Sequence, residues 1–316
     1  MDSQKQQHSR RARKHHYLSS AYLAGFTTSG KNSDYLLVLD LEKCESRRGK
    51  PANVAYQCDL YTVDVFETPD EVEKSHAKQE SDILPVIKHV CENKRFSNDE
   101  LDQLLSFISL TSARLPSMRY YMKAYVEKQT GKPFEEALLD QGAWQWLSEC
   151  SGKPLDHVFA DIKQSMSDKS QLWHVLSIAP VHVMLLNILR EKVWSLCIAS
   201  QDCKLVCTDN PIGAAFPLDY ASDASPAFGN PATILTFPLD RHAALVSGVY
   251  KSPCIAHVTD SAIAEINTRT LQRANRFVFA PSTDFSFFLR DGTIQKGDSI
   301  FELIKSDSAV NRRMIK

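Results

Sequence analysis

A short run of branched and apolar side chains at residues 35–41 predicts the first buried strand of the chain. Residues 53–61 alternate between apolar and polar side chains, which predicts a second strand. A charged, turn-rich connector at residues 45–51 separates the two. We expect these two strands to pair with each other as an antiparallel ribbon.

From about residue 68 to about residue 190 the apolar positions recur with helical spacing, and we expect five or six helices there. Ser97 and Glu100 form a capping box ahead of an apolar stripe, which predicts that a helix begins at this point. A proline pushes the residue before it out of the helical region. We therefore expect helix boundaries at Pro133, Pro154 and Pro180.

The apolar period returns to two beyond residue 190 and predicts strands at 194–199, 205–208, 233–237, 243–247 and 276–280, with one helix at 260–275. The whole pattern favours an α+β fold, in which a central helical block is flanked by N-terminal and C-terminal strands that join one mixed sheet. We expect a flexible basic tail at 1–14, a single domain at 15–300 with its helical insert at about 68–190, and a weakly structured tail at 301–316.

The composition is that of an ordinary globular protein, with 43% hydrophobic and 24% charged residues among 316. Lys and Arg together number 37 and Asp and Glu 38, so net charge provides no general attraction to nucleic acid or to an anionic membrane. A local attraction is possible at the basic run Arg10–Lys14, which we consider as a nucleic-acid contact; the alternative is a solvated tail.

The sequence contains no apolar segment of the length that spans a membrane, and its eight cysteines are scattered without a Cys-x-x-Cys pair. We therefore expect a soluble, cytoplasmic protein without a disulfide framework and without a membrane partner. The glycine-rich phosphate loops, the serine-hydrolase elbow and the His-Glu-x-x-His zinc motif are also missing from the sequence. This absence excludes the common nucleotide-cofactor and serine-hydrolase classes.

Three ionisable residues, Glu73, His76 and Glu80, continue an apolar helical stripe at spacings of three and four. Two carboxylates and an imidazole that face a protein interior are costly unless they pair or bind a cation, so the pattern points to a metal site or to acid–base chemistry. The alternative is that Pro85 bends the helix and turns its first half outward, where these residues would form a solvated surface.

Two further ionisable side chains stand at predicted turns or ends. His16 precedes an aromatic anchor and has the ordinary pKa of a residue that can act as a general base or as a ligand near neutral pH. Arg114 lies at a helix break just before Leu115 and Pro116, where its guanidinium can clamp a phosphate or carboxylate. A structural Arg that caps the carbonyls of the preceding helix is equally consistent with this position.

Asp209 follows a predicted strand, in the pattern Thr208-Asp209-Asn210-Pro211. Strand ends commonly carry working groups, so this carboxylate is a candidate metal ligand or base. It is also expected to form an Asx-turn with the backbone ahead of Pro211. Asn267 lies inside a predicted helix, where Asn is a poor helix former and usually has a polar partner.

Many of these pieces occur in a fixed order: His16, Tyr22, Leu23, Phe26, Asn53, Val54, Asp59, Tyr61, Glu80, Arg114, Pro116, Trp194, Thr208–Pro211, Phe237–Leu239, Ile266, Asn267 and Ala274. The ordered set, over about residues 15–281, resembles an uncharacterised, mainly bacterial domain-of-unknown-function family, number 4238. Ser19 departs from the family, which usually has a proline there.

The resemblance implies one domain with polar positions at His16, Glu80, Arg114, Asp209 and Asn267, and it implies no activity. The family that the chain resembles is similar to families that occur as accessory or toxin-like proteins in bacterial defence neighbourhoods.

The leading hypothesis from the sequence is a metal-assisted phosphodiester hydrolase, that is, a nuclease-like enzyme. Glu80, Asp209 and His76 would hold a divalent cation such as Mg²⁺ or Mn²⁺, His16 would act as base or ligand, and Arg114 would stabilise charge on the phosphoryl group. The alternative is a non-catalytic module that binds an anionic ligand or a partner protein, with the polar set as a buried network. A metal-free transferase or lyase that uses His16 is a third possibility.

Overall fold

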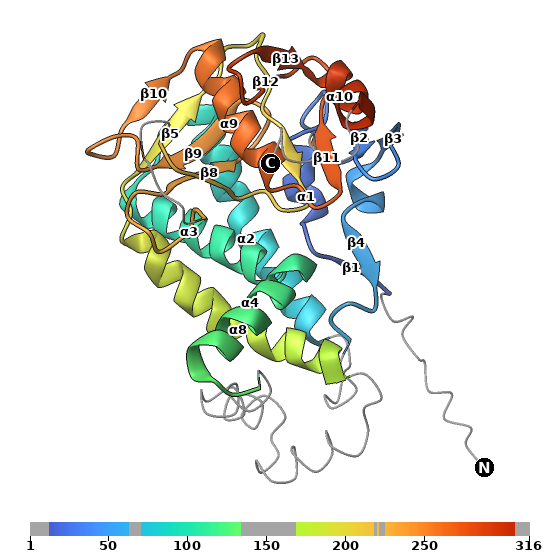
Figure 1. Cartoon of the computed structure of the whole chain (residues 1–316), viewed down its shortest axis with the longest axis vertical. Helices are drawn as coiled ribbons and strands as arrows, with labels where there is room; N and C mark the ends of the chain where they lie inside the picture. Colours follow the sequence, from blue (N-terminus) through green and yellow to red (C-terminus); the bar gives the residue numbers. More distant parts are fainter. Residues whose placement is uncertain (1–12, 63–70, 134–168, 218–219, 221–224, 307–316) are drawn as a thin grey trace, which may run out of the picture.

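The computed structural model describes residues 13–62, 71–133, 169–217, 220 and 225–306 (Figure 1). The strands gather in the upper part of the view and a block of long helices lies beneath them. The mixed α+β class predicted from the sequence is confirmed. The strands form several sheets, however, so the prediction of one joined mixed sheet is wrong.

The first of the two larger sheets has four antiparallel strands in the order β3-β2-β11-β6. Their bounds are Glu45–Gly49 for β3, Leu36–Asp40 for β2, Phe277–Ala280 for β11 and Cys207–Thr208 for β6. Val38 of β2 lies opposite Phe279 of β11, so a strand from the N-terminal part of the chain pairs with one from the C-terminal part in this sheet.

The second large sheet has five strands in the order β10-β5-β9-β8-β7, and only the β10–β5 pair is parallel. The bounds are Ile255–His257 for β10, Trp194–Ile198 for β5, Ala243–Ser247 for β9, Ile234–Pro238 for β8 and Gly213–Ala215 for β7. Every residue of β5, β8 and β9 is buried, as expected for strands that are covered on both faces.

Helix α9 (Asp260–Gln272) packs against β7 and β8 on one side of this sheet. At Gly213 a Cβ atom would meet Thr236 Oγ1 at 2.3 Å and Arg269 Cβ at 3.0 Å. A residue without a side chain is therefore needed where the helix crosses the strand.

Two short ribbons complete the strands. One pairs β1 (Lys14–His16) with β4 (Tyr56–Cys58), and the other pairs β12 (Ser286–Phe288) with β13 (Ile294–Lys296). The predicted ribbon between residues 35–41 and 53–61 is therefore wrong. The segment at residues 45–51, predicted to be a connector, contains the edge strand β3 instead, because Cys44 adopts a positive φ of 52° and turns the chain back onto β2. A turn of 3₁₀ helix, Pro51–Asn53, then leads to β4.

The helical block consists, within the described residues, of α2 (Glu71–Asn93), α3 (Asn98–Ala113), α4 (Pro116–Thr130) and α8 (Lys169–Arg190), and a short α1 (Ser20–Ala24) lies nearer the sheets. The capping box is confirmed, because the Ser97 hydroxyl accepts from the Glu100 N–H and the Glu100 carboxylate accepts from the Ser97 N–H. Gly131 is the C-cap of α4 and adopts the left-handed conformation, with φ 65°.

Among the described helices, α2 and α8 each have a proline in their interior. Helix α2 continues through Pro85 and α8 continues through Pro180, so the boundary predicted at Pro180 is wrong. Buried apolar side chains on both sides of Pro180, including Ile178 and Val181, fix α8 in the core and offset the lost hydrogen bond. Pro154 lies outside the described residues. Beyond β13, a 3₁₀ turn (Gly297–Ser299) and helix α10 (Ile300–Ser306) form where the sequence predicted the start of a weakly structured tail.

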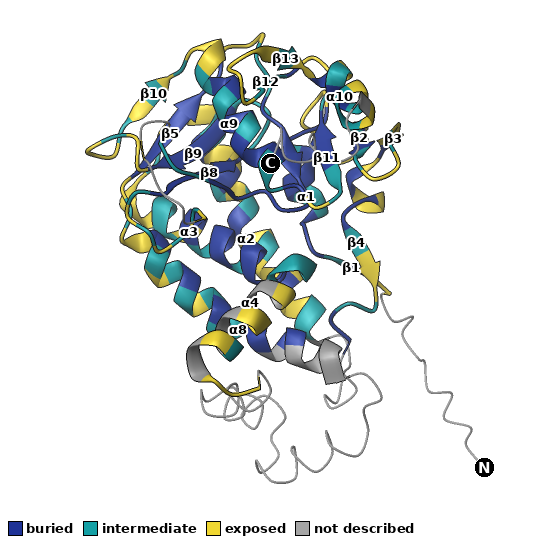
Figure 2. Cartoon of the chain, in the orientation of Figure 1, coloured by how far each residue is buried: buried dark blue, intermediate teal, exposed yellow. Residues whose placement is uncertain are grey.

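The core runs between the sheets and the helical block, as the dark blue residues in Figure 2 show. Tyr22 lies inside it, stacks on Phe237 with ring centroids 5.5 Å apart, and donates its hydroxyl hydrogen to the Pro238 carbonyl at 2.6 Å. The Trp194 indole donates to the Leu189 carbonyl at 2.8 Å. Several positions of the ordered set are therefore packing positions. Among the described helices, none is long and apolar enough to cross a membrane.

Candidate polar site at the helical block

Arg114 is the centre of a buried polar site. It is the C-cap residue of α3, and its backbone N–H donates to the carbonyls of Leu110 and Ser112. The Arg114 side chain is only 1% exposed, and its Nη2 forms an ion pair with the Glu80 carboxylate of α2. Within the described chain, Nε and Nη1 of the same guanidinium have no hydrogen-bond partner. Buried donors of a charged group are costly to leave unpaired, so these two nitrogens are candidate hydrogen-bond donors to an anionic group.

The inward face of α2 carries the residues that the sequence pattern selected. His76 is 5% exposed, and its ring packs edge-on against Tyr61 with centroids 4.9 Å apart. Glu80 pairs with Arg114, and Glu73 accepts a hydrogen bond from the His16 backbone N–H. The alternative of an outward, solvated first half of α2 is therefore wrong for His76, because Pro85 does not interrupt the helix.

Tyr61 links the β1–β4 ribbon to the helices. Its hydroxyl donates to the Arg114 carbonyl at 3.2 Å, and its backbone N–H donates to His15 Nδ1 at 2.9 Å. The rings of His15 and His174 stack on Tyr61, at centroid distances of 5.8 and 6.1 Å. The sequence argument missed His15, Tyr61 and His174 as neighbours of the site, although Tyr61 belongs to the ordered set. His15 lies in a strand of three residues, which is too short to give a periodic signal, and the contacts of Tyr61 and His174 are long-range.

The ionisable groups of the site have shifted pKa values. Burial, opposed by the Arg114 charge and reinforced by Glu80, raises the pKa of Glu73 to about 7. Burial lowers the pKa of His16 and, more strongly, that of His76, and the Arg114 charge lowers both. At neutral pH the site therefore has neutral imidazoles, a permanent cation and a carboxyl group that is partly protonated.

A cavity of about 300 Å³ opens between α2, α3 and α8, and Glu80 and Arg114 form part of its wall. Polar side chains surround it, including Gln79, Gln103 and Ser106. His182 also lines the cavity, and its Nδ1 is 2.8 Å from the Ser109 hydroxyl. The Arg114–Glu80 pair is thus both buried in the protein and adjacent to a space large enough for a small ligand.

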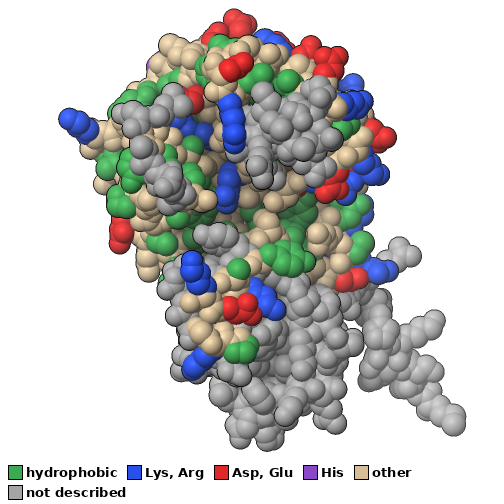
Figure 3. Space-filling model, viewed as in Figure 1, with side chains coloured by type: hydrophobic (Ala, Val, Ile, Leu, Met, Phe, Trp, Pro, Cys, Tyr) green, Lys and Arg blue, Asp and Glu red, His purple; other side chains and the backbone are tan. Residues whose placement is uncertain are grey.

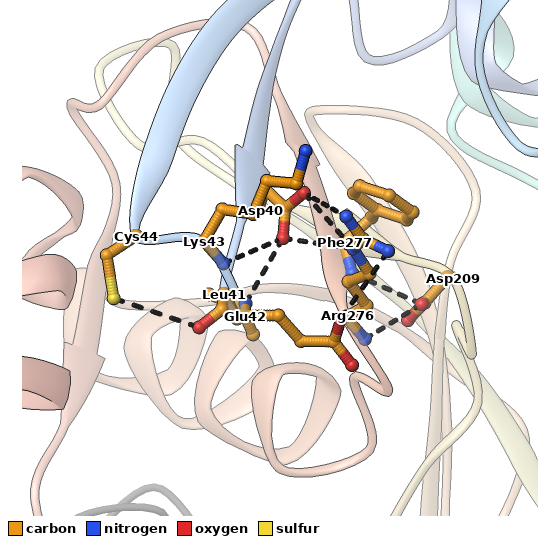
Figure 4. A network of polar contacts seen from close by, with 8 residues as sticks. All are labelled: Asp40, Leu41, Glu42, Lys43, Cys44, Asp209, Arg276 and Phe277. Carbon is orange, nitrogen blue, oxygen red and sulfur yellow. Dashed lines mark hydrogen bonds and ion pairs between the residues drawn. The ribbon is translucent and has the colours of Figure 1, made fainter. Parts of the chain in front are cut away.

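Asp209 is held in a different place (Figure 4). Its carboxylate accepts three backbone hydrogen bonds, from the N–H groups of Asn275 at 2.8 Å, Arg276 at 2.9 Å and Phe277 at 3.1 Å. Arg276 in turn makes a forked contact with Asp40 of β2. Burial raises the pKa of Asp209 to about 6, against these backbone hydrogen bonds, which lower it. Asp209 therefore fastens the start of β11 to the end of β6.

The turn that follows β6 is made by Thr208 and not by Asp209. The Thr208 hydroxyl donates to the Asn210 carbonyl at 2.8 Å and accepts from the Asn210 N–H at 3.3 Å. The expected Asx-turn of Asp209 is corrected accordingly: its carboxylate is already occupied by the backbone of residues 275–277.

Asn267 is 0% exposed and fully paired. Its Oδ1 accepts from the Val206 N–H at 3.0 Å, and its Nδ2 donates to the carbonyls of Lys204 at 2.9 Å and Ser286 at 3.0 Å. The side chain connects α9 to the segment before β6 and to β12, which is a structural role.

The ligand set predicted for a metal, Glu80, Asp209 and His76, is not assembled. Over the part of the chain that the structure describes, no group of three or more His, Cys, Asp and Glu side chains is placed to hold a metal ion. The physical reason is that Asp209 is engaged at the β6–β11 junction, whereas Glu80 and His76 lie on α2.

The basic run at the N-terminus is described only from Arg13 onward. Arg13 pairs with Asp59 at 3.2 Å, and Lys14 donates to Asn53 and lies 4.8 Å from the Tyr56 ring. These two side chains therefore contact the β1–β4 ribbon, and Arg10 and Arg11 lie outside the described residues. On the face shown in Figure 3, positive and negative side chains are interspersed.

The fold and the site define a mixed α+β domain with a buried arginine–carboxylate pair beside a small cavity. Residues 14–284 match the family model described as "Protein of unknown function (DUF4238)". The match covers most of the chain, and the protein belongs to this family, as its resemblance predicted. No curated protein and no solved structure matches the chain.

Proposed function

We propose that the protein binds a ligand through an anionic group at Arg114. The observation that carries this proposal is the fully buried guanidinium, whose Nε and Nη1 have no partner within the described chain. Glu80 occupies only Nη2, so a phosphate or carboxylate oxygen at the other nitrogens would supply the missing charge-assisted hydrogen bonds.

Three carboxylates line the adjacent cavity, Glu80, Asp82 and Asp102, and two of them are paired with cations, Glu80 with Arg114 and Asp102 with Arg190. Burial raises the pKa of Glu73 to about 7, so this neighbour loses much of its negative charge near neutral pH. The adjacent cavity of about 300 Å³ is at the lower end of the usual range for small-molecule sites. The ligand is therefore a small anion, or the anionic end of a larger molecule.

Phosphodiester hydrolysis is the second candidate function, and the pKa of Glu73 favours it. A carboxyl group with a pKa of about 7 can give or accept a proton at neutral pH, and His16 lies beside it with its Nε2 unpaired in the described chain. Arg114 would stabilise charge on the phosphoryl group. A metal-assisted form of this reaction would need ligands in addition to the carboxylates on α2.

Thermal unfolding with added anions tests the binding proposal, because a ligand that binds only the folded state raises its stability. Sodium phosphate and sodium sulfate, at constant ionic strength, should raise the midpoint of the wild type and not that of Arg114→Lys, which keeps the charge and loses the fork. Arg13→Lys, the same substitution at an exposed position, should respond like the wild type. A phosphate response retained in Arg114→Lys would contradict the proposal.

Hydrolysis is tested separately with bis(4-nitrophenyl) phosphate and single-stranded RNA and DNA, in EDTA, Mg²⁺ or Mn²⁺. Turnover that is lost in both Glu73→Gln and Arg114→Lys supports the enzyme. Turnover that survives both substitutions, or no turnover under any condition, contradicts it. The binding proposal stands or falls on the unfolding experiment alone.

A further inference from the structure

A second cavity, of about 580 Å³, lies where the end of α2 meets the five-stranded sheet, away from Arg114. Its wall brings together cations from three separate segments: Lys94 just beyond α2, Lys204 between β5 and β6, and Arg241 between β8 and β9. Ile198 and Pro281 add apolar surface to the same wall. The cavity is within the usual size range of sites for small molecules.

The cations of this cavity are not neutralised by ion pairs. Arg241 donates through Nη1 to the carbonyls of Thr27 at 3.3 Å and Gly25 at 3.5 Å, and Lys204 donates to the Gln201 carbonyl. Across the described ranges, neither of them nor Lys94 forms a salt bridge.

The two carboxylates in the wall have other roles. Asp240 accepts from the backbone N–H groups of His242 at 2.7 Å and Ala243 at 2.8 Å, and it thereby fixes the turn before β9. Glu92 is 64% exposed and lies 3.8 Å from Lys88 on the same helix. Neither carboxylate forms a salt bridge with the three cations within the described chain, and the wall has three cations against two carboxylates.

His242 also lines the cavity. Burial lowers the pKa of its imidazole, the charges of Lys204 and Arg241 lower it further, and that of Asp240 raises it. A dianion in the cavity would gain several charge-assisted hydrogen bonds from side chains that already face the same space.

We infer that this second cavity, with Lys94, Lys204 and Arg241 in its wall, binds a small organic phosphate. The phosphate lies between the three cations, and the organic part rests on the apolar surface of Ile198 and Pro281. Side chains from separate segments provide the charge here, so the site needs no glycine-rich phosphate loop. The inference concerns a different place from Arg114 and is independent of the function proposed for that site.

Isothermal titration calorimetry with AMP, inorganic phosphate and adenosine tests the inference on the full chain. AMP should bind more tightly than phosphate, and adenosine should not bind measurably. The double substitution Lys94→Gln, Lys204→Gln should weaken AMP binding at least about tenfold, because it removes two charged donors. Lys43→Gln, at an exposed lysine in the turn between β2 and β3 that does not line the cavity, is the control and should bind AMP like the wild type.

Arg114→Lys separates this cavity from the first one. AMP binding that is retained in Arg114→Lys and lost in the double variant supports the second cavity. Binding that is lost in Arg114→Lys and retained in the double variant overturns the inference, as does equal weakening in Lys43→Gln or the absence of binding by the wild type. Circular dichroism of the double variant should match that of the wild type, since neither lysine is buried.

Discussion

Asn267→Asp replaces one buried donor by an acceptor of the same shape. In the wild type, Nδ2 donates to the carbonyls of Lys204 and Ser286, and Oδ1 accepts from the Val206 N–H. An ionised aspartate would place an oxygen against two carbonyl oxygens at a position that is 0% exposed. We therefore expect the folded variant to keep its carboxyl group protonated.

The cost follows from these contacts. A protonated carboxyl group has one O–H, so one of the two carbonyls loses its partner, at about 1–3 kcal/mol. Holding a proton at pH 7 on a group with an ordinary pKa of about 3.9 costs a further 4 kcal/mol or so, at about 1.4 kcal/mol for each pH unit. The total is about 5–7 kcal/mol at pH 7. It falls by about 2.7 kcal/mol at pH 5, because the unfolded aspartate is then closer to protonation.

Urea unfolding of wild type and variant at pH 7 and pH 5 measures this difference. Asn267→Leu is the control, since it also breaks the three hydrogen bonds but introduces no ionisable group. Its destabilisation should be the same at both pH values. A loss below about 1 kcal/mol for Asn267→Asp, or a loss that does not change with pH, would refute the assignment of Asn267 as a paired core residue.

Three further predictions concern other contacts. Burial raises the folded pKa of Asp209 to about 6, so protonation of this group stabilises the fold below about pH 4, and that contribution is lost as the pH rises through 6. The thermal unfolding midpoint of the wild type, measured relative to that of Asp209→Asn, should therefore increase from pH 7 to pH 4.5. A difference that does not change with pH would contradict this. Ser97→Ala removes the cap of α3 and should cost about 1 kcal/mol in urea unfolding, whereas no loss would mean that the cap is not formed in solution. Tyr61→Phe removes the hydrogen bond to the Arg114 carbonyl and should also cost about 1 kcal/mol in urea unfolding, with an unchanged far-ultraviolet circular dichroism spectrum. A variant as stable as the wild type would show that this hydrogen bond does not contribute to stability.

The sequence predicted those helices and strands in which apolar side chains recur with a regular period. The apolar stripe of α2 placed Glu73, His76 and Glu80 on one inward face, because helical spacing relates residues three and four apart wherever the helix packs. The strands β5 and β9 are buried throughout and apolar except for Ser195 and Ser247, and they were predicted within a residue or two, since a strand that is buried on both faces leaves a largely apolar run.

Contacts between segments that lie far apart in the chain were not predictable in the same way. Strand β3 reads as a charged connector because it is an edge strand with mostly exposed side chains, so the partner of β2 was missed. Asp209 and Glu80 are both carboxylates in the ordered set, but long-range packing puts them in separate networks. His15, near the N-terminus, and His174, on α8, reach Tyr61 from segments far apart in the sequence, which only the tertiary structure shows.

The central claim is that the free nitrogens of Arg114 receive an anion, and nuclear magnetic resonance of arginine Nε–H groups tests it most directly. The buried Arg114 resonance is identified by its absence in Arg114→Lys. Titration with sodium sulfate, whose charge is constant near neutral pH, should shift this resonance and saturate, more strongly as the pH falls through 7 and Glu73 takes up its proton. An Arg114 resonance that stays in place over the whole titration, while the protein remains folded, would contradict the account.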